Sequence, residues 1–261
     1  MFVYVLHAPE TRAAALDLVE QGINDCEVAR RLGIPRATVR DWRAPRYVPR
    51  TNRVLCPRCW LPGKPNVFSD DDYGLLLGLY LGDGCISRLA RTYSLRISLD
   101  VKYPFIVDTT EDLLSRCFPD SSAGRHHQDD GHCAVVNVYS NHLPCLFPQH
   151  GPGKKHLRKI ALENWQQEIV DRAPWSFLQG MVWSDGASFI NRHGKYEDLC
   201  YVFSNCSNDL LGLFAATCDV LGLPYRHYPA QPDGDRVRVG SVRINRREPV
   251  ARLQEHIGIK R

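Results

Sequence analysis

The sequence predicts an α+β protein in which a small all-helical domain precedes two similar α+β halves. An apolar segment that ends in Asp-Gly occurs twice, at residues 73–84 and at residues 175–186. Alternating strand patterns and an amphipathic helix follow each segment, whereas residues 10–43 contain only helical patterns. The expected organisation is a helical domain at 1–46, a linker at 47–70, a first half at 71–160, a second linker at 161–174 and a second half at 175–261.

The bulk composition is that of an ordinary globular protein. With 261 residues and a net charge of +4, the chain is long enough for more than one core. No apolar segment approaches the roughly 20 residues that cross a bilayer, and the N-terminus lacks the basic start of a signal peptide. The ten cysteines are scattered along the chain, which favours reduced thiols over a disulfide framework. We therefore expect a cytoplasmic protein with no membrane partner.

Residues 10–43 have the pattern of a helix-turn-helix. Helical periodicity covers residues 10–20, 25–32 and 36–42, and Gly33 falls in the tight turn before the last helix. That helix directs polar and basic side chains outward, which suits the phosphates and base edges of DNA. This unit resembles the homeodomain-like helix-turn-helix of resolvases and transposases; a helical bundle with an arginine-rich exterior is the alternative. The candidate DNA contacts are Arg36, Thr38, Arg40 and Arg43.

A basic and proline-rich connection follows the helices. Between Asp25 and Arg53 eight arginines accompany three acids, a balance that favours nucleic acid but also fits a solvated face. Five prolines between residues 45 and 65 exclude a regular helix. Cys56-x-x-Cys59 is half of a zinc site, but no second ligand pair follows at the usual distance, so a turn without zinc is expected. The residues that could complete a site only through space are His126, His127, His132 and Cys133.

Each apolar helix of the two halves ends in an acid. Asp83 and Asp185 are 102 residues apart, and each carboxylate would lie against the negative end of its helix dipole. Two adjacent carboxylates also repel unless cations lie between them. An acid exposed to water at each helix end is the alternative. Small residues four apart would let the two helices cross closely and bring the acids together; they are Gly78 with Gly82 and Gly180 with Ser184.

The strands after each acid alternate between apolar and polar residues. In the segment 93–99 every second side chain is apolar, and residues 236–244 alternate valine or isoleucine with arginine across an expected bulge at Gly240-Ser241. One face of each sheet should therefore be covered by helices, while the other face presents polar and basic groups to DNA or to solvent. The candidate DNA contacts on this face are Arg96, Arg236, Arg238 and Arg243.

Two segments match a known signature position by position. Leu76-Leu-Gly-Leu-Tyr-Leu-Gly-Asp-Gly84 and Leu178-Gln-Gly-Met-Val-Trp-Ser-Asp-Gly186 both align with the LAGLIDADG motif. Residues 70–261 resemble a two-repeat, single-chain LAGLIDADG homing endonuclease. The resemblance implies αββαββα-like halves that form a β-saddle for double-stranded DNA. It also implies Mg²⁺ or another divalent cation bound by Asp83, Asp185 and the carbonyls of Gly82 and Ser184.

The resemblance further implies a catalytic lysine near the end of each half. Lys155 and Lys260 are the candidates, with Lys154 as an alternative to Lys155. A lysine that contacts phosphate or only solvent explains these positions equally well. Two further basic residues have no sharper assignment, Arg246 and Arg247.

The sequence thus predicts a monomeric, metal-dependent, site-specific double-strand DNA endonuclease. The alternative is a transcription regulator that binds DNA on the same scaffold without cutting it, and a third, weaker hypothesis is a role in RNA binding or splicing. Acids at both Asp83 and Asp185 favour the nuclease, because a protein without catalytic demand has no reason to keep two repelling carboxylates.

Overall fold

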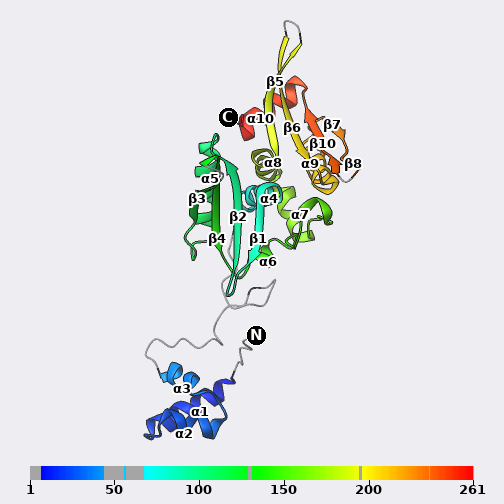
Figure 1. Cartoon of the computed structure of the whole chain (residues 1–261). Coiled ribbons are helices and arrows are strands. Elements are labelled where there is room, and N and C mark those ends of the chain that lie inside the picture. The colour runs from blue at the N-terminus through cyan, green and yellow to red at the C-terminus, as the bar shows by residue number, and fades with distance from the viewer. Residues whose placement is uncertain are drawn as a thin grey trace. The chain divides into compact units, whose positions relative to one another are not determined.

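The chain folds as two compact units, residues 1–64 and residues 65–261. The computed structural model describes residues 7–43, 56, 68–128, 131–193, 196–234 and 236–260 (Figure 1). Each unit has its own hydrophobic core. The finer domain boundaries expected from the sequence stay a prediction.

The first unit is a bundle of three short helices, as predicted. The helices are α1 (Pro9–Glu20), α2 (Asp25–Leu32) and α3 (Arg36–Arg43). The side chain of Asn24 caps α2 by accepting hydrogen bonds from the next amides. Gly33 ends α2 in the left-handed conformation, at a φ of 63°, which a glycine adopts without strain. The buried core consists of Ala15, Val28, Ile34, Val39 and Trp42.

Two crossed helices form the centre of the second unit. They are α4 (Asp70–Asp83) and α8 (Pro174–Trp183). A side-chain carbon added to Gly78 would lie 2.5 Å from the carbonyl oxygen of Phe177. An equivalent carbon on Gly180 would collide with the backbone of α4 at Leu75. The backbones therefore touch at these glycines, and this contact brings the C-terminal ends of the two helices together.

An antiparallel sheet follows α4. Its strands are β1 (Gly84–Arg88), β2 (Tyr93–Asp100), β3 (Gly124–Gln128) and β4 (Cys133–Tyr139), in the order β1-β2-β4-β3. Helix α5 (Pro104–Cys117) packs on β2 and β4. The predicted alternation on β2 is confirmed at Leu95, Ile97 and Leu99, which are all buried.

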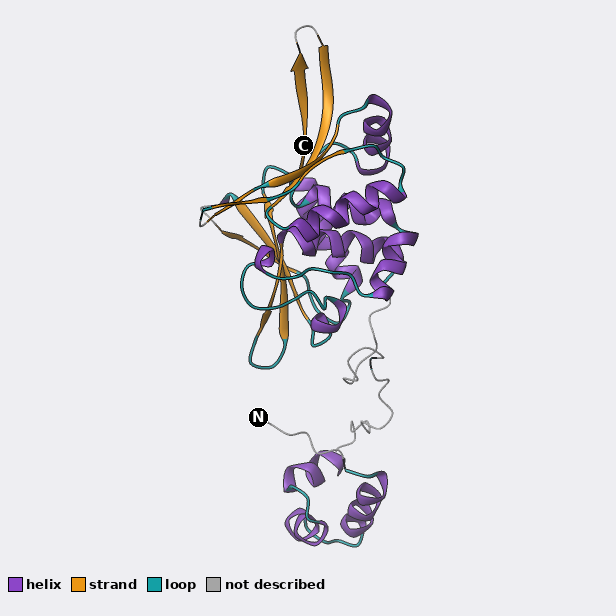
Figure 2. Cartoon of the chain, turned by 90° about the vertical axis from the view of Figure 1, so that its right-hand side faces the viewer, coloured by secondary structure: helices purple, strands orange, loops and turns teal. Residues whose placement is uncertain are grey.

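A second antiparallel sheet follows α8. Its strands are β5 (Gly186–His193), β6 (Tyr196–Asn205), β7 (Arg226–Tyr228) and β10 (Gly240–Ile244), in the order β5-β6-β10-β7. The helices that pack on it are α9 (Asn208–Val220) and α10 (Arg247–Ile257). The two halves therefore share the order of helix, hairpin, helix and further strands. Figure 2 shows the strands on one side of this unit and the helices gathered on the other.

The expected bulge at Gly240-Ser241 is wrong. Gly240 and Ser241 pair regularly with β6, and the segment divides into two strands at Val239, because β9 (Arg236–Arg238) pairs with β8 (Gln231–Asp233) in a separate two-stranded sheet. Only β10 continues in the main sheet, where Val242 and Ile244 are fully buried. Val239, between the two strands, is 56% exposed instead of packing under a helix.

Three short elements complete the second unit. They are α6 (Leu143–Leu146), the 3-10 helix η3 (Lys155–Leu157) and α7 (Asn164–Arg172). Helix α7 lies in the segment expected to be a plain linker, and a reciprocal capping box between Glu163 and Gln166 starts it. Among the described residues, no helix is long and apolar enough to cross a membrane.

Candidate active site

The two aspartates lie where α4 and α8 end side by side. Asp83 is the last residue of α4, and Asp185 follows α8 after one residue, Ser184. A side-chain carbon added to Gly82 would meet the side chains of Ser184 and Asp185. The close helix crossing predicted from the small residues therefore brings both Asp-Gly turns to one place.

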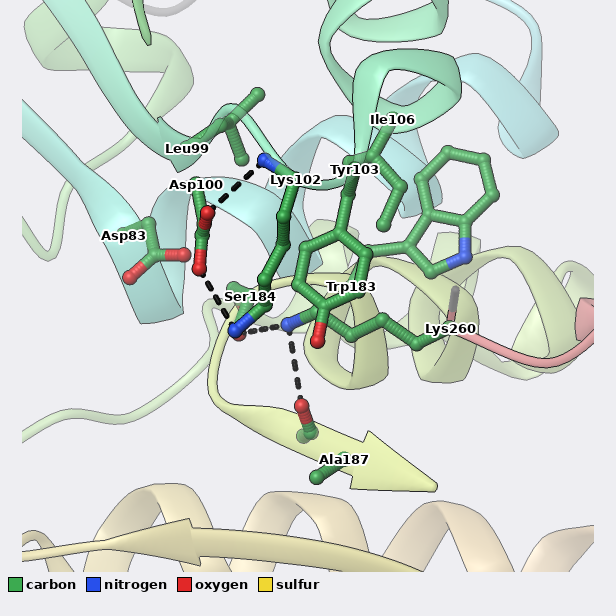
Figure 3. Close-up of a pocket in the computed structure, with 11 residues that line it drawn as sticks. Asp83, Leu99, Asp100, Lys102, Tyr103, Ile106, Trp183, Ser184, Ala187 and Lys260 are labelled. Carbon is green, nitrogen blue, oxygen red and sulfur yellow. Dashed lines mark hydrogen bonds and ion pairs between the residues drawn. The ribbon is translucent and has the colours of Figure 1, made fainter. Parts of the chain in front are cut away.

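The first aspartate opens into a cavity of about 300 Å³, which we call the Asp83 cavity. Besides Asp83, residues of the second half line it, namely Ser184, Gly186 and Lys260. Figure 3 shows Asp83, Ser184 and Lys260 together with Asp100, the last residue of β2, and Lys102, which follows it. The cavity thus combines the acid of one half with the turn and lysine of the other.

The second aspartate opens into a cavity of about 290 Å³, which we call the Asp185 cavity. Gly82 and Lys155 of the first half line it, beside Asn205 of the second half. The arrangement of the first cavity is therefore repeated with the halves exchanged. Each cavity contains one of the two motif aspartates, the residue before the other aspartate, and one of the two candidate lysines; the Asp83 cavity also contains Asp100 and Lys102.

The two candidate lysines bind backbone carbonyls at the helix ends. The Nζ atom of Lys155 donates to the carbonyls of Tyr80, Leu81 and Gly82 at 2.6, 3.0 and 2.8 Å. The Nζ atom of Lys260 donates to the carbonyls of Ser184 and Gly186 at 2.6 and 3.1 Å. Lys154 is exposed and lines neither cavity.

The ammonium groups supply the compensation that the helix dipoles demand. Each one lies at the negative end of a helix, where a positive charge is favourable. The resemblance named Lys155 and Lys260 as candidates, but their contacts with the helix ends join residues more than 70 positions apart along the chain.

Burial perturbs the pKa values of both acids. Burial, and next the charge of Asp185, raise the pKa of Asp83 to about 7, against the opposing effect of Lys260 and Lys155. Burial also raises the pKa of Asp185, although Lys155 and a hydrogen bond from Asn205 act in the other direction. Two carboxylates that resist ionisation in one place are typical of a functional site.

Burial also lowers the pKa values of the two lysines. The pKa of Lys155 falls to about 8, since burial outweighs the attraction of Asp185 and Asp83. The pKa of Lys260 is lowered for the same reason. All four groups therefore favour their charged forms less than they would in water.

The donor set suits a divalent cation. Hard cations such as Mg²⁺, Mn²⁺ and Ca²⁺ prefer carboxylate and carbonyl oxygens, and each cavity offers a motif carboxylate together with Gly82 or Ser184. Burial disfavours the charged forms of Asp83 and Asp185 and raises their pKa values, and a bound cation would favour the ionised carboxylates.

Three residues near the acids escaped the sequence analysis. Asn205 donates from Nδ2 to Oδ2 of Asp185 at 2.7 Å, and its Oδ1 accepts from the amide of Ser207 at 2.7 Å. Asp100 forms an ion pair with Lys102 at 2.8 Å beside Asp83. Asn205 and Asp100 could have been found from the hairpin after each acid, since they end the strands that pair with β5 and β1.

The predicted DNA contacts of the second unit lie on three strands. Arg96 on β2 and Arg243 on β10 are exposed residues of the two main sheets. Arg236 and Arg238 are exposed on β9, in the small separate sheet. The expectation of one continuous basic strand is thus corrected, whereas a role of these arginines in DNA binding stays a prediction.

The predicted DNA contacts of the first unit lie on α3. Arg36, Arg40 and Arg43 are exposed, and Thr38 is half-buried. Arg43 pairs with Asp25 at 3.3 Å. The side chains of this helix that form the core are Val39 and Trp42, on its opposite face.

The expectation that Cys56 and Cys59 form a turn without zinc stays a prediction, because Cys59 lies outside the described residues. Among the described parts of the chain, the four residues suggested as remote partners, from His126 to Cys133, do not form a group of three metal ligands. His142 and Cys145 at α6 have the two-residue spacing of zinc ligands, and the sequence analysis did not weigh them. The Sγ atom of Cys145 donates to the carbonyl of His142 at 3.0 Å.

The comparison of the sequence with protein families finds a match in the first unit. A sequence model described as a homeodomain-like domain matches residues 7–44. No characterised protein matches the sequence.

Solved structures that resemble the chain are LAGLIDADG proteins. Mesophilic variants of the homing endonuclease I-DmoI match with a TM-score of 0.51 and 16% identity, over 73% of this chain and 96% of that chain. The complex of I-DmoI with DNA and Mn matches with a TM-score of 0.51 and 16% identity, over 73% and 98%. The N-terminal LAGLIDADG domain of DUF199/WhiA has a TM-score of 0.46 and 13% identity, over 76% and 87%.

The fold of this chain is therefore the α+β fold of LAGLIDADG proteins, with a helix-turn-helix-like unit before it. One solved structure with this fold, that of the homing endonuclease I-DmoI, contains DNA and Mn. At these identities the likeness establishes the fold alone.

Proposed function

We propose that this chain is a metal-dependent, site-specific double-strand DNA endonuclease of the homing type. The observation that carries the proposal is the pair of cavities at the ends of α4 and α8, each with one motif aspartate, the turn of the other motif and one of the two candidate lysines. A duplicated unit that cuts both strands needs two such centres close together. We infer a duplication of the two halves and a monomer that acts without a partner subunit.

Asp83 and Asp185 would hold the divalent cation, with the carbonyls of Gly82 and Ser184 as further ligands. When bound, Mg²⁺ would supply an activated water and charge stabilisation at the scissile phosphate. The chain's own residues keep the site narrow, because the glycine contact between α4 and α8 fixes the distance between the acids. Lys155 and Lys260 would stabilise negative charge on the phosphate, since both ammonium groups lie in the cavities.

The sheets and the first unit would bind the DNA. Arg96 and Arg243 are exposed on the strand side of the second unit, and arginine suits bidentate contacts to phosphates and guanines. Residues Arg36, Arg40 and Arg43 of α3 would extend the contact as a recognition helix does. We place this activity in the cytoplasm, as expected from the sequence.

One observation favours a second candidate, a DNA-binding regulator that does not cut. The lysines already bind the carbonyls of Gly82 and Ser184 at 2.8 and 2.6 Å, so the helix ends are compensated without any metal. A scaffold that keeps its shape in this way could serve DNA binding alone.

Sequencing of DNA ends distinguishes the two functions. The full chain is incubated with a randomised double-stranded DNA library in Mg²⁺, with a parallel reaction in EDTA. The nuclease predicts a single family of new ends on both strands, present only with Mg²⁺. Sequence-specific binding without any new ends would contradict the nuclease and support the regulator.

A further inference from the structure

Two ammonium groups occupy the carbonyl oxygens that the proposed metal site requires. Lys155 Nζ lies 2.8 Å from the carbonyl oxygen of Gly82, and Lys260 Nζ lies 2.6 Å from that of Ser184. A divalent cation bound to either oxygen would lie beside a positive charge. Like charges at such a separation repel strongly in a partly buried site.

Each ammonium has a complete binding place of its own. Lys155 Nζ has three carbonyl acceptors at the end of α4 and lies 5.2 Å from the ring centroid of Tyr80. Lys260 Nζ has two carbonyl acceptors and lies 5.1 Å from the ring centroid of Tyr103. Carbonyl dipoles and aromatic faces both attract a single positive charge.

The charges of the two cavities are balanced without metal. Lys155 lines the same cavity as Asp185, and Lys260 lines the same cavity as Asp83. The ammonium groups are attracted by both aspartates. Each lysine therefore supplies one of the positive charges that a divalent cation would supply in the same cavity.

We propose that Lys155 and Lys260 are the resident cations of the metal-free site, and that a divalent cation binds only as each ammonium leaves its carbonyl. The inference rests on the proposed function, because it concerns the regulation of the same metal site. The released ammonium would then contact a DNA phosphate. DNA and metal therefore bind cooperatively, which keeps the site weakly loaded until DNA arrives.

Manganese binding to lysine variants tests this exchange. The variants Lys155→Met and Lys260→Met are made in the full chain without DNA, and free Mn²⁺ is measured by electron paramagnetic resonance. Because displacing a hydrogen-bonded ammonium is no longer required, each variant should bind one Mn²⁺ about tenfold more tightly than wild type. The melting temperature without metal should fall by about 4 °C.

Lys154→Met is the matched control, since its side chain is exposed and lines neither cavity. It should change neither Mn²⁺ affinity nor melting temperature. Unchanged or weaker Mn²⁺ binding in Lys155→Met and Lys260→Met would overturn the inference, because a lysine that merely supports the site would lower the affinity when removed.

A second measurement uses the wild-type chain in case a variant does not fold. The ¹⁵N signals of buried lysine ammonium groups are followed during a Ca²⁺ titration. Two such signals should be lost as Ca²⁺ binds, and signals that persist at saturation would overturn the inference. Neither readout depends on cleavage. A chain that exchanges lysine for metal but never cuts DNA would contradict the proposed function and leave the exchange standing.

Discussion

The Asp83 cavity and the Asp185 cavity share a backbone plan but differ in their neighbours. Gly84 pairs with Ile97 on the first sheet, and Gly186 pairs with Phe203 on the second. Leu99 and Asn205, two residues farther along, therefore occupy equivalent positions. Leu99 is buried and offers no polar group, whereas Asn205 donates a hydrogen bond of 2.7 Å to Asp185.

The next equivalent positions differ as well. Asp100 lines the Asp83 cavity and pairs with Lys102, whereas Cys206 lines the Asp185 cavity. Asp185 thus accepts a hydrogen bond from an amide side chain. Asp83 has no equivalent amide beside it, and burial and neighbouring charges alone set its pKa. The pKa values of both acids are raised by burial, but only the strand beside Asp185 places an amide that orients the carboxylate.

Loss of either aspartate should have the largest effect. Asp83→Asn and Asp185→Asn each remove a carboxylate from one cavity, and cleavage of a plasmid with the selected target should slow by about 10³-fold or more. DNA binding should persist in both variants. Asp198→Asn, an exposed acid outside both cavities, is the control and should cut normally. Linearisation at the wild-type rate by either aspartate variant would contradict the assignment.

A substitution that separates α4 from α8 should disrupt both cavities, because both are built from the ends of these helices. Gly78→Val forces a side chain against the backbone of Phe177 and Met181, and we expect a loss of at least about 3 kcal/mol in the free energy of unfolding. Urea unfolding followed by circular dichroism measures it. Gly212→Ala on α9 is the control, because an added carbon there meets nothing within 4 Å. It should stabilise by about 0.5–1 kcal/mol; equal behaviour of the two variants would argue against the close crossing.

The raised pKa of Asp83 predicts how stability depends on pH. The pKa of about 7 in the folded protein lies above the unfolded value of about 3.9. The folded state then binds the proton more tightly, so this group destabilises the fold as the pH rises from about 4 to about 7. In EDTA, Asp83→Asn should therefore be more stable than wild type by about 2–4 kcal/mol at about pH 8.

The same comparison at about pH 4 should show almost no difference, because the wild-type group is then neutral in the folded state. Asp185→Asn should gain less stability than Asp83→Asn, since Lys155 and Asn205 offset part of the rise that burial causes in the pKa of Asp185. Urea unfolding across this pH range provides the measurement. Parallel stability curves for wild type and Asp83→Asn would contradict the raised pKa.

Removal of the Asn205 amide should have the smallest effect and should show whether the hydrogen bond to Asp185 makes the two cavities differ. Asn205→Leu gives the Asp185 cavity the residue type that the Asp83 cavity has at Leu99, and Mn²⁺ affinity there should fall by about tenfold. The other cavity should be unaffected. Asn191→Leu on β5 is the control, because its side chain lines neither cavity. An equal loss of affinity in both cavities would contradict a separate role for Asn205.

Much of the fold was predictable because local patterns carry it. The period of the apolar residues defined α2, α3 and β2, and small residues four apart indicated the crossing at Gly78 and Gly180. Helix α7 was not predicted, although Leu162, Trp165 and Ile169 have helical spacing and a capping box between Glu163 and Gln166 starts the helix. The break after Val239 was missed because both strands keep the same alternation of arginine and valine.

The site was predictable only in part. The repeated motif was enough to identify Asp83 and Asp185. The carbonyl contacts of Lys155, by contrast, span more than 70 residues and depend on the path of η3. The partner of Asp185, Asn205, depends on hairpin register, which no single segment reveals. Long-range contacts of this kind arise from tertiary packing and not from local propensity.

The central claim is that Asp83 and Asp185 hold divalent cations against DNA. The most direct measurement is an anomalous difference map from crystals of the full chain with its selected DNA and Mn²⁺. We expect Mn²⁺ peaks within coordination distance of both carboxylates and of a phosphate on each strand, with the Lys155 and Lys260 ammonium groups moved away from Gly82 and Ser184. DNA bound in place with no Mn²⁺ at either aspartate would contradict it.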